Sequence, residues 1–178
     1  MIEVREPRWD DFGSLTESYY DLYAEVKERP DLGILLFAEK PTLGQEAVWF
    51  GQLLREVEEG RRVAGVAVVD DRAVGLCEVH HRGPSPEIGH LGELGIVVAR
   101  GHRDRGVGRA LLKFVLDKCR GRFSVIVLSV FVRNESARHL YRSVGFRPWG
   151  ILPRAVRRGP TYYDEEHMVL DLEPPTGG

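Results

Sequence analysis

Two spacings of apolar residues divide the chain into helices and strands. Apolar side chains recur at helical spacing in residues 7–28 and 42–59, and again at 106–119 and 136–144. β-branched and alternating apolar stretches, which favour strands, lie around and between these helices. We expect strands at residues 2–5, 63–69, 73–80, 91–99, 123–132, 146–150 and 162–172.

Turn and cap residues define the element boundaries. Thr42 and Gln45 have the spacing of a capping box at the start of the second helix, and Gly60 is suited to end it. Asp70 and Asp71 predict a tight turn between two strands. Strands dominate first and helices interleave later, which predicts an α/β or α+β fold with a mixed sheet. We expect one domain at 1–172 and a flexible tail at 173–178.

Composition excludes several classes of protein. The chain has 178 residues and a formal net charge of −2. A net charge so near zero gives no overall attraction to nucleic acid or to an anionic membrane, so we expect neither as a partner. The longest apolar run, residues 123–132, is too short for a membrane helix. The first residues also lack the apolar segment of a signal peptide.

The two cysteines and the histidines favour a cytoplasmic protein without a metal. Cys77 and Cys119 lie in apolar stretches without C-x-x-C spacing, which predicts reduced core residues. A nucleophile or a metal ligand is the alternative role for either thiol. The sequence has no H-E-x-x-H motif and no Cys/His cluster, so we expect no metal site.

A turn rich in glycine and arginine carries the clearest chemistry. It joins the strand at 91–99 to the helix at 106–119 and contains Gly106 and Gly108, which let a ligand approach the backbone. Unpaired N–H groups and the dipole at a helix start attract anions. Four arginines add positive charge against Asp104: Arg100, Arg103, Arg105 and Arg109. The pattern predicts a diphosphate site, and the alternative is a glycine-rich connector with solvated arginines.

Two motifs in this half of the chain resemble one family. Arg103-x-x-Gly106-x-Gly108 after a strand is similar to the acetyl-CoA signature of the GNAT superfamily of N-acetyltransferases. Residues 134–146 read Asn-x-x-Ala-x-x-Leu-Tyr-x-x-x-Gly-Phe and resemble a second block of that family, in the family's order and separation. The resemblance implies a mostly antiparallel mixed sheet of about seven strands, flanked by about four helices. Its splayed parallel pair would be the strands at 91–99 and 123–132.

The resemblance also implies how acetyl-CoA is held. Its pantetheine arm would lie between the two splayed strands, and a backbone N–H near Ile96 would polarise the thioester carbonyl. Asn134 has an alternative or additional role as a helix N-cap. The residues implied to contact the cofactor are Ile96, Val97, Val98, Arg103, Asp104, Arg105, Gly106, Val107, Gly108, Arg109, Asn134, Ala137 and Tyr141.

Two proton transfers require side chains in this reaction. By resemblance, Tyr141 is the acid that protonates the departing sulfur, and the alternative is a tyrosine that packs its helix on the sheet. Glu93 is the candidate base for the amine, through a water, and His90 is the substitute. The alternative is that Glu93 faces solvent or pairs with an arginine. Gly92 and Gly95 could also form a bulge, which would change the direction in which the Glu93 side chain points.

The resemblance implies transfer of an acetyl group to a primary amine, but the sequence leaves the acceptor open. A protein N-terminus, a lysine, an amino acid and a small amine are all candidates, and a homodimer is left open too. The segments 19–49 and 153–166 would form the acceptor side. Arg154, Arg157 and Arg158 indicate either an acceptor with a carboxylate or phosphate or a solvated loop. A catalytically weak acyl-CoA-binding sensor is the alternative function.

Overall fold

Seven strands form one sheet in the order β1-β2-β3-β4-β5-β7-β6 in the computed structural model, which describes residues 1–173. All neighbouring strands are antiparallel except β4 and β5, which are parallel. The predicted mixed, mostly antiparallel sheet is therefore confirmed. The strands are β1 (Glu3–Arg5), β2 (Arg62–Val69), β3 (Arg72–His81), β4 (Leu91–Val98), β5 (Val125–Phe131), β6 (Arg147–Arg158) and β7 (Thr161–Asp171).

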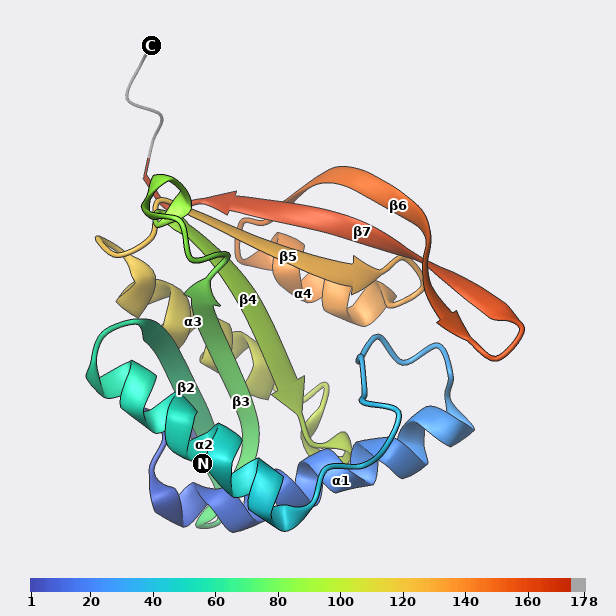
Figure 1. Cartoon of the computed structure of the whole chain (residues 1–178), viewed down its shortest axis with the longest axis horizontal. Coiled ribbons are helices and arrows are strands. Elements are labelled where there is room, and N and C mark those ends of the chain that lie inside the picture. The colour runs from blue at the N-terminus through green and yellow to red at the C-terminus, as the bar shows by residue number, and fades with distance from the viewer. Residues whose placement is uncertain (174–178) are drawn as a thin grey trace.

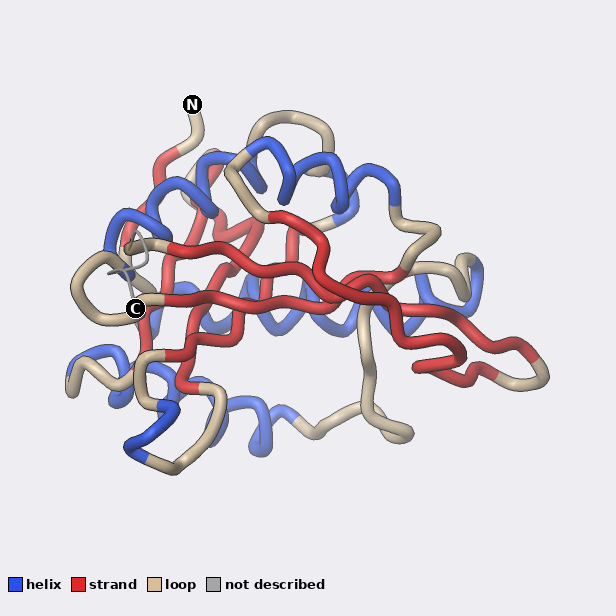
Figure 2. Tube along the Cα trace, turned by 90° about the horizontal axis from the view of Figure 1, so that it is seen from above, coloured by secondary structure: helices blue, strands red, loops and turns tan. Residues whose placement is uncertain are grey.

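Helices cover both faces of this sheet (Figure 2). The helices α1 (Phe12–Glu28) and α2 (Leu43–Glu58) lie on one face, where α1 contacts β3 and α2 contacts β2. The helices α3 (Val107–Cys119) and α4 (Glu135–Ser143) lie on the other face, with α3 against β2 and β3. The four predicted helices are therefore present. Three lie within one residue of their expected bounds, whereas α1 begins at Phe12, five residues after the expected start at residue 7.

The largest group of buried side chains lies between the sheet and the pair α3 and α4. The apolar residues of α3 recur at helical spacing, so they form one stripe that faces the strands. β3 contributes alternate residues to the same layer, because successive side chains of a strand point to opposite faces. Members of this core include Cys77, Val79, Leu111, Val115, Cys119, Ile126 and Met168, all 0% exposed.

The local turn signals of the sequence are confirmed. Gln45 N–H donates to Thr42 Oγ1 over 3.3 Å, and Thr42 N–H donates to Gln45 Oε1 over 2.9 Å, which completes the capping box. Asp70 and Asp71 adopt positive φ angles of 49° and 61° in the β2–β3 hairpin, as a tight hairpin turn requires. Cys77 and Cys119 are buried and unbonded, as expected.

One strand is much longer than the sequence indicates. Residues 151–158 continue β6 and pair with β7 in a hairpin, whereas a strand ending at 150 and a loop were expected. Pro153 and the arginines of this segment are unusual in central strands, so the sequence did not predict a strand here. β6 lies at the edge of the sheet, where a proline on the unpaired side interrupts no hydrogen bonds between strands. The register shifts between Leu152 and Val156, and Arg154 has a φ of 56°. Of the tail expected at 173–178, only Glu173 lies within the described residues.

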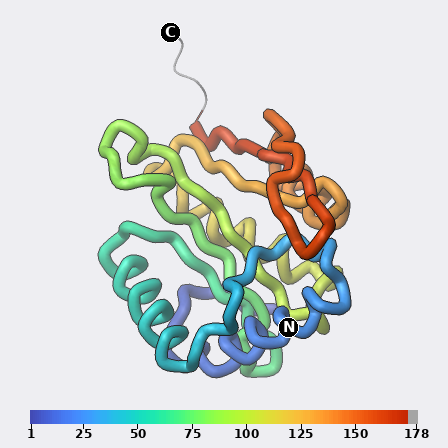
Figure 3. The backbone as a smooth tube through the Cα atoms, turned by 45° about the vertical axis from the view of Figure 1, so that its right-hand side comes forward, coloured from blue at the N-terminus to red at the C-terminus, as the bar shows by residue number. Residues whose placement is uncertain are grey.

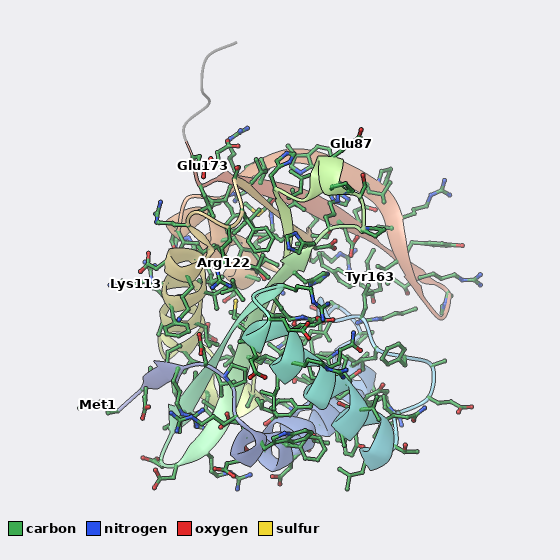
Figure 4. The ribbon with its side chains drawn as sticks, turned by 60° about the vertical axis from the view of Figure 1, so that its left-hand side comes forward. Met1, Glu87, Lys113, Arg122, Tyr163 and Glu173 are labelled. Atoms are coloured by element: carbon green, nitrogen blue, oxygen red, sulfur yellow. The ribbon has the colours of Figure 1, made fainter. Side chains whose placement is uncertain are left out.

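The β6–β7 hairpin reaches the loop between α1 and α2 (Figures 1 and 3). Arg158 donates to the carbonyl oxygens of Pro30 over 2.6 Å and Leu32 over 2.7 Å, and also to that of Ile34. Tyr163, labelled in Figure 4, stacks on Phe131 with ring centroids 5.3 Å apart. Arg158 is therefore an anchor for the α1–α2 loop and not part of a solvated loop.

The parallel strands β4 and β5 separate soon after they meet. They pair only at three positions, from Leu91 opposite Val125 to Glu93 opposite Val127. β4 remains paired with β3 as far as Val98, and β5 remains paired with β7 as far as Phe131. The two strands therefore diverge into a V (Figure 1), which confirms the predicted splayed pair.

Candidate functional site

The split between β4 and β5 exposes an edge of backbone within the sheet. From Leu94 to Val98, β4 pairs with β3 on one side and with no strand on the side of β5. An unpaired strand edge presents N–H and C=O groups that can bind an extended ligand as an added strand. Ile96, Val97 and Val98, which were predicted to contact the cofactor, all lie on this edge.

The start of α3 lies directly beside the split. A Cβ built on Gly108 would lie 4.0 Å from Ile96 Cδ1, so the first turn of α3 contacts β4. No side chain caps α3, whereas Thr42 caps α2 and Asn134 caps α4. The first N–H groups of α3 are therefore left for an external acceptor, and the helix dipole makes this a position for an anion.

Two of the four arginines on the turn are already paired with α1. Arg103 donates to Glu25 through both terminal nitrogens over 2.5 and 2.8 Å, and its Nε donates to the Val98 carbonyl over 2.9 Å. Arg100 pairs with Glu28 over 2.9 Å. Of the four positive charges that the sequence places on this turn, two are therefore balanced by carboxylates of α1. Arg105 and Arg109 are exposed and remain the cations of the turn.

The two glycines of the signature have different roles. Gly106 adopts a φ of +85°, and a Cβ built on it would meet nothing within 4 Å. A Cβ on Gly108 would lie 2.9 Å from Leu140 Cδ2, so this glycine allows α3 and α4 to pack closely. Both glycines were expected to let a ligand approach the backbone, and only Gly106 has open space beside it. The neighbouring Val107 is 2% exposed and anchors the helix start in the core.

The turn and the second motif are tied together. Asp104, at a φ of 58°, accepts a hydrogen bond from Ser136 Oγ of α4 over 3.2 Å. Asn134 Oδ1 accepts from the N–H of Ala137 over 3.2 Å, which confirms its role as an N-cap. Both motifs therefore meet beside the open end of the β4–β5 split.

Tyr141 projects from α4 into the core on the α3 side of the sheet. It is 8% exposed and lies edge-on to Phe146 with ring centroids 5.9 Å apart. Burial raises the pKa of its phenol well above the usual value, and the nearby Cys77 contributes in the same direction. The hydroxyl is therefore protonated at neutral pH, as a proton donor must be.

The candidate bases lie on different parts of β4. The register from Gly75 opposite Val98 to His81 opposite Gly92 is continuous, so the suspected glycine bulge is absent from this pairing. Glu93 is exposed and directly opposite His80, on the face of α1 and α2. His90 is exposed and precedes β4, roughly 20 Å along the chain from Ile96, at the closed end of the V.

A cavity of about 290 Å³ lies between β4 and the helices α1 and α2. Gly95, Ile96 and Val97 of β4 line it, so it opens on the separated part of the strand. Two carboxylates that the sequence analysis missed also line it, Glu46 of α2 and Glu78 of β3. A Cβ built on Gly95 would lie 4.0 Å from Glu78 Oε1, which places this carboxylate next to Ile96.

The environments of Glu78 and Glu46 differ. Glu78 forms an ion pair with Arg62, which also pairs with Glu56 over 2.6 Å. Burial raises the pKa of Glu46 above its ordinary value. The alternation of Leu76, Glu78 and His80 on one face of a hairpin strand was the available signal for Glu78. No sequence signal pointed to Glu46, because its approach to β3 and β4 depends on how α2 packs on the sheet.

Residues 1–173 offer neither a membrane-spanning helix nor a cluster of metal ligands. No helix in this range is long and apolar enough to cross a membrane. Within the same residues, no three or more His, Cys, Asp or Glu side chains are grouped as a metal site would need.

Comparison with solved structures identifies the fold. YncA of Salmonella typhimurium, a putative acetyltransferase solved with its cofactor acetyl-CoA, superposes with a TM-score of 0.83 at 18% identity, covering 99% of this chain and 96% of YncA. A ribosomal-protein-alanine N-acetyltransferase from Brucella melitensis superposes with a TM-score of 0.81 at 23% identity, covering 95% of this chain and 99% of that one. At these identities the likeness concerns the fold.

Sequence comparison gives the family. L-amino acid N-acetyltransferase AaaT of Escherichia coli K12 is 32% identical over 108 residues, 58% of this chain and 65% of AaaT. N-alpha-acetyltransferase RimI of Mycobacterium tuberculosis is 45% identical over 56 residues, 32% of this chain and 34% of RimI. The chain thus spans less than two thirds of each relative. The model of the Acetyltransferase (GNAT) family matches residues 9–146, most of the chain, and the chain therefore belongs to the GNAT family of acetyltransferases.

Proposed function

We propose that this protein is an acetyl-CoA-dependent N-acetyltransferase that acts on a primary amine, with both substrates bound at once. The observation that supports it is the split between β4 and β5 with the uncapped start of α3 beside it. An extended, amide-containing arm can add to the edge of β4, while a diphosphate binds the N–H groups of α3. Family membership points to the same ligand.

The residues present fit acetyl-CoA, which supplies an acetyl group activated as a thioester. Gly106 leaves open space over the helix start, and Arg105 and Arg109 are exposed beside it. The side chain of Arg103 would act indirectly, by holding the turn against α1. Asn134 and Ala137 would contact the ligand from the start of α4. Ile96, Val97 and Val98 would bind the arm through their backbone groups.

In the proposed reaction one C–N bond forms and one C–S bond breaks. The amine nitrogen attacks the thioester carbon, and a backbone N–H near Ile96 stabilises the developing oxyanion. The amine gives up a proton to a base, for which Glu93 is the proposed residue through a water. The departing sulfur takes a proton from the Tyr141 hydroxyl and leaves as a thiol. Holding the two reactants together supplies the remaining acceleration.

The acceptor is proposed to be a small amine or the N-terminus of a protein. The name of one relative, an N-alpha-acetyltransferase, supports the N-terminus of a protein. The name of another, an L-amino acid N-acetyltransferase, supports a small molecule as acceptor and leaves open whether that molecule carries a carboxylate here. The two thiols, Cys77 and Cys119, are buried and unpaired, as is usual for proteins of a reducing compartment, which supports a cytoplasmic location.

A thiol-release assay with acetyl-CoA tests the proposal. A panel of primary amines and short peptides is incubated with the protein, and free CoA is measured with a thiol reagent. We expect release that depends on both the amine and the protein, and an acetylated amine visible by mass spectrometry. Tight CoA binding by calorimetry without turnover on any amine would instead support the acyl-CoA sensor.

A further inference from the structure

We propose that the acceptor is a primary amine on an apolar group, with no carboxylate beside the amine, and that Glu46 selects against such a carboxylate. This inference rests on the proposed acetyltransferase function and specifies its substrate class. The cavity between β4 and α2 carries the argument, through its position, its size and its charge.

The position of the cavity suits the attacking amine. Its floor is formed by Gly95, Ile96 and Val97, the part of β4 that has separated from β5. An amine held there lies next to the backbone edge assigned to the thioester. The cavity lies on the α1 and α2 face of the sheet, opposite the face on which Tyr141 is buried.

The size and lining favour an apolar group. A cavity of about 150 Å³ is enough to hold benzene, and this one measures about 290 Å³. An aromatic ring with a short amine-bearing chain therefore fits. Aromatic side chains from three segments line the cavity, namely Tyr19 of α1, Phe37 of the α1–α2 loop, and Trp49 and Phe50 of α2. Phe37 is 70% exposed and Trp49 is 42% exposed, so they also present apolar surface toward solvent.

The charge of the lining opposes an acidic acceptor. Glu46 and Glu78 are its charged residues, and neither lysine, arginine nor histidine lines it within the described part of the chain. The charge of Glu78 is compensated by Arg62, whereas Glu46 forms no ion pair with any residue in the range 1–173. A carboxylate on the acceptor would be buried beside Glu46 without a cation, and like charges close together in a partly dry site repel strongly.

Arg154, Arg157 and Arg158, the residues considered from the sequence as partners of an acidic acceptor, do not line the cavity. Arg158 is bonded to carbonyls of the α1–α2 loop, and Arg157 Nε donates to the Gly159 carbonyl over 3.0 Å. Arg154 lies over the ring of Tyr162, 6.0 Å from its centroid. Lys40, of the loop between α1 and α2, lies over Tyr20, 4.4 Å from its ring centroid, and does not line the cavity.

The test compares amines that share a phenyl group. The kcat/KM for thiol release is measured with 2-phenylethylamine and L-phenylalanine, each expressed per concentration of neutral amine, and then with a peptide beginning in phenylalanine. We expect the amine without a carboxylate to exceed L-phenylalanine by about 10- to 100-fold. The peptide arm shows whether the natural acceptor is a small amine or a chain N-terminus. Equal or faster turnover of L-phenylalanine would overturn the proposal while leaving the acetyltransferase function intact.

Variants assign the selection to one residue. Glu46→Gln keeps the size of the side chain and removes its charge, so the preference against L-phenylalanine is expected to shrink about tenfold. Glu58→Gln, an exposed position on the same helix, is the matched control and should leave the preference unchanged. An unchanged ratio in Glu46→Gln refutes the role of Glu46. If no amine is turned over, the acetyltransferase proposal fails, and calorimetry of the two ligands with the CoA complex still decides the preference.

Discussion

Arg103 of the signature turn and Glu25 of α1 form a bidentate ion pair, with nitrogen–oxygen distances of 2.5 and 2.8 Å. The carboxylate of Glu25 is nearly buried, with 4% of its side chain exposed, against 24% for Arg103. Arg103 also bonds the carbonyl of Val98, the last residue of β4. A single guanidinium therefore joins α1, β4 and the turn between β4 and α3.

We expect Glu25→Gln to lower the free energy of unfolding by about 1–3 kcal/mol, because it leaves the Arg103 guanidinium without its charged partner. The double variant with Arg103→Gln should show a coupling energy of similar size in a denaturation cycle. Arg100 and Glu28 are the matched control, since they join the same turn and helix but are each 62% exposed. That pair should show no measurable coupling. Equal coupling in both pairs would contradict the anchoring role of Arg103.

Local signals were enough for most of the fold. The Thr42–Gln45 capping box, the aspartate turn after β2 and the stripe of α3 each depend on residues within a few positions of one another. Such features can be read from a sequence because the physical interaction is itself local. The splayed pair was expected only because two motifs resembled a known family, and the three-position pairing of β4 with β5 then confirmed it.

Features that depend on distant residues could not be predicted. Glu25 and Arg103 are 78 positions apart, so nothing near the signature reveals that one of its arginines is neutralised. Glu46 and Glu78 enter one cavity only because α2 packs on the sheet. β6 was missed beyond residue 150 for a different reason: proline and arginine disfavour central strands but are tolerated at an edge.

The two signature glycines are expected to separate stability from ligand binding. Gly106→Ala introduces a side chain at a φ of +85° in open space, so its strain should lower the free energy of unfolding by about 1–2 kcal/mol. It should also weaken CoA binding at least tenfold, because the methyl group and any backbone shift lie where the diphosphate approaches. Calorimetry with CoA and denaturation measure the two effects.

Gly108→Ala is the control variant. Its methyl group would force Leu140 to move, so the free energy of unfolding should fall while the affinity for CoA changes less than in Gly106→Ala. CoA affinity unchanged in Gly106→Ala would count against the placement of the diphosphate.

Tyr141→Phe should lower kcat by about 100-fold with little change in the KM for acetyl-CoA, because only the donated proton is lost. Since burial raises the phenol pKa, the wild-type hydroxyl stays protonated through the neutral and mildly alkaline range. Activity should therefore not decline from its titration below about pH 10. Steady-state kinetics across pH check both points. Tyr162→Phe, at an exposed tyrosine of the hairpin, is the control and should retain full activity. A fully active Tyr141→Phe enzyme would remove the acid assignment.

Glu93→Gln should lower kcat by about 100-fold, because the residue proposed to accept the amine proton is lost. Glu78→Gln is the informative comparison, because Glu78 lies over Gly95 and closer to Ile96 than Glu93 does. The Glu78 variant should keep most of its kcat and change mainly the KM for the amine, as steady-state kinetics with varied amine would measure. The reverse result, with kcat lost only in Glu78→Gln, would transfer the role of base to Glu78.

Glu166 of β7 should make stability depend on acid pH. It is 4% exposed and accepts bonds from Arg138, with nitrogen–oxygen distances of 2.9 Å, and from Arg142. The Arg138 hydrogen bonds lower the pKa of Glu166, and its attraction to both arginines adds to them against the opposing effect of burial. The folded state therefore binds its proton less readily than the unfolded state does. The resulting stability is present above the unfolded pKa of about 4.3 and is lost as pH falls through the folded pKa.

Glu166→Gln should accordingly lower the free energy of unfolding by about 1–3 kcal/mol at pH 7, since two arginines lose their shared partner. The difference between wild type and variant should stay constant from about pH 6 to pH 8 and shrink below about pH 4, where the wild-type carboxylate is also protonated. Urea denaturation at a series of pH values measures it. Glu165→Gln, on the adjacent residue of the same strand, should show no such dependence. A Glu166 difference that persists undiminished in acid would mean that shape, and not charge, holds α4 to β7.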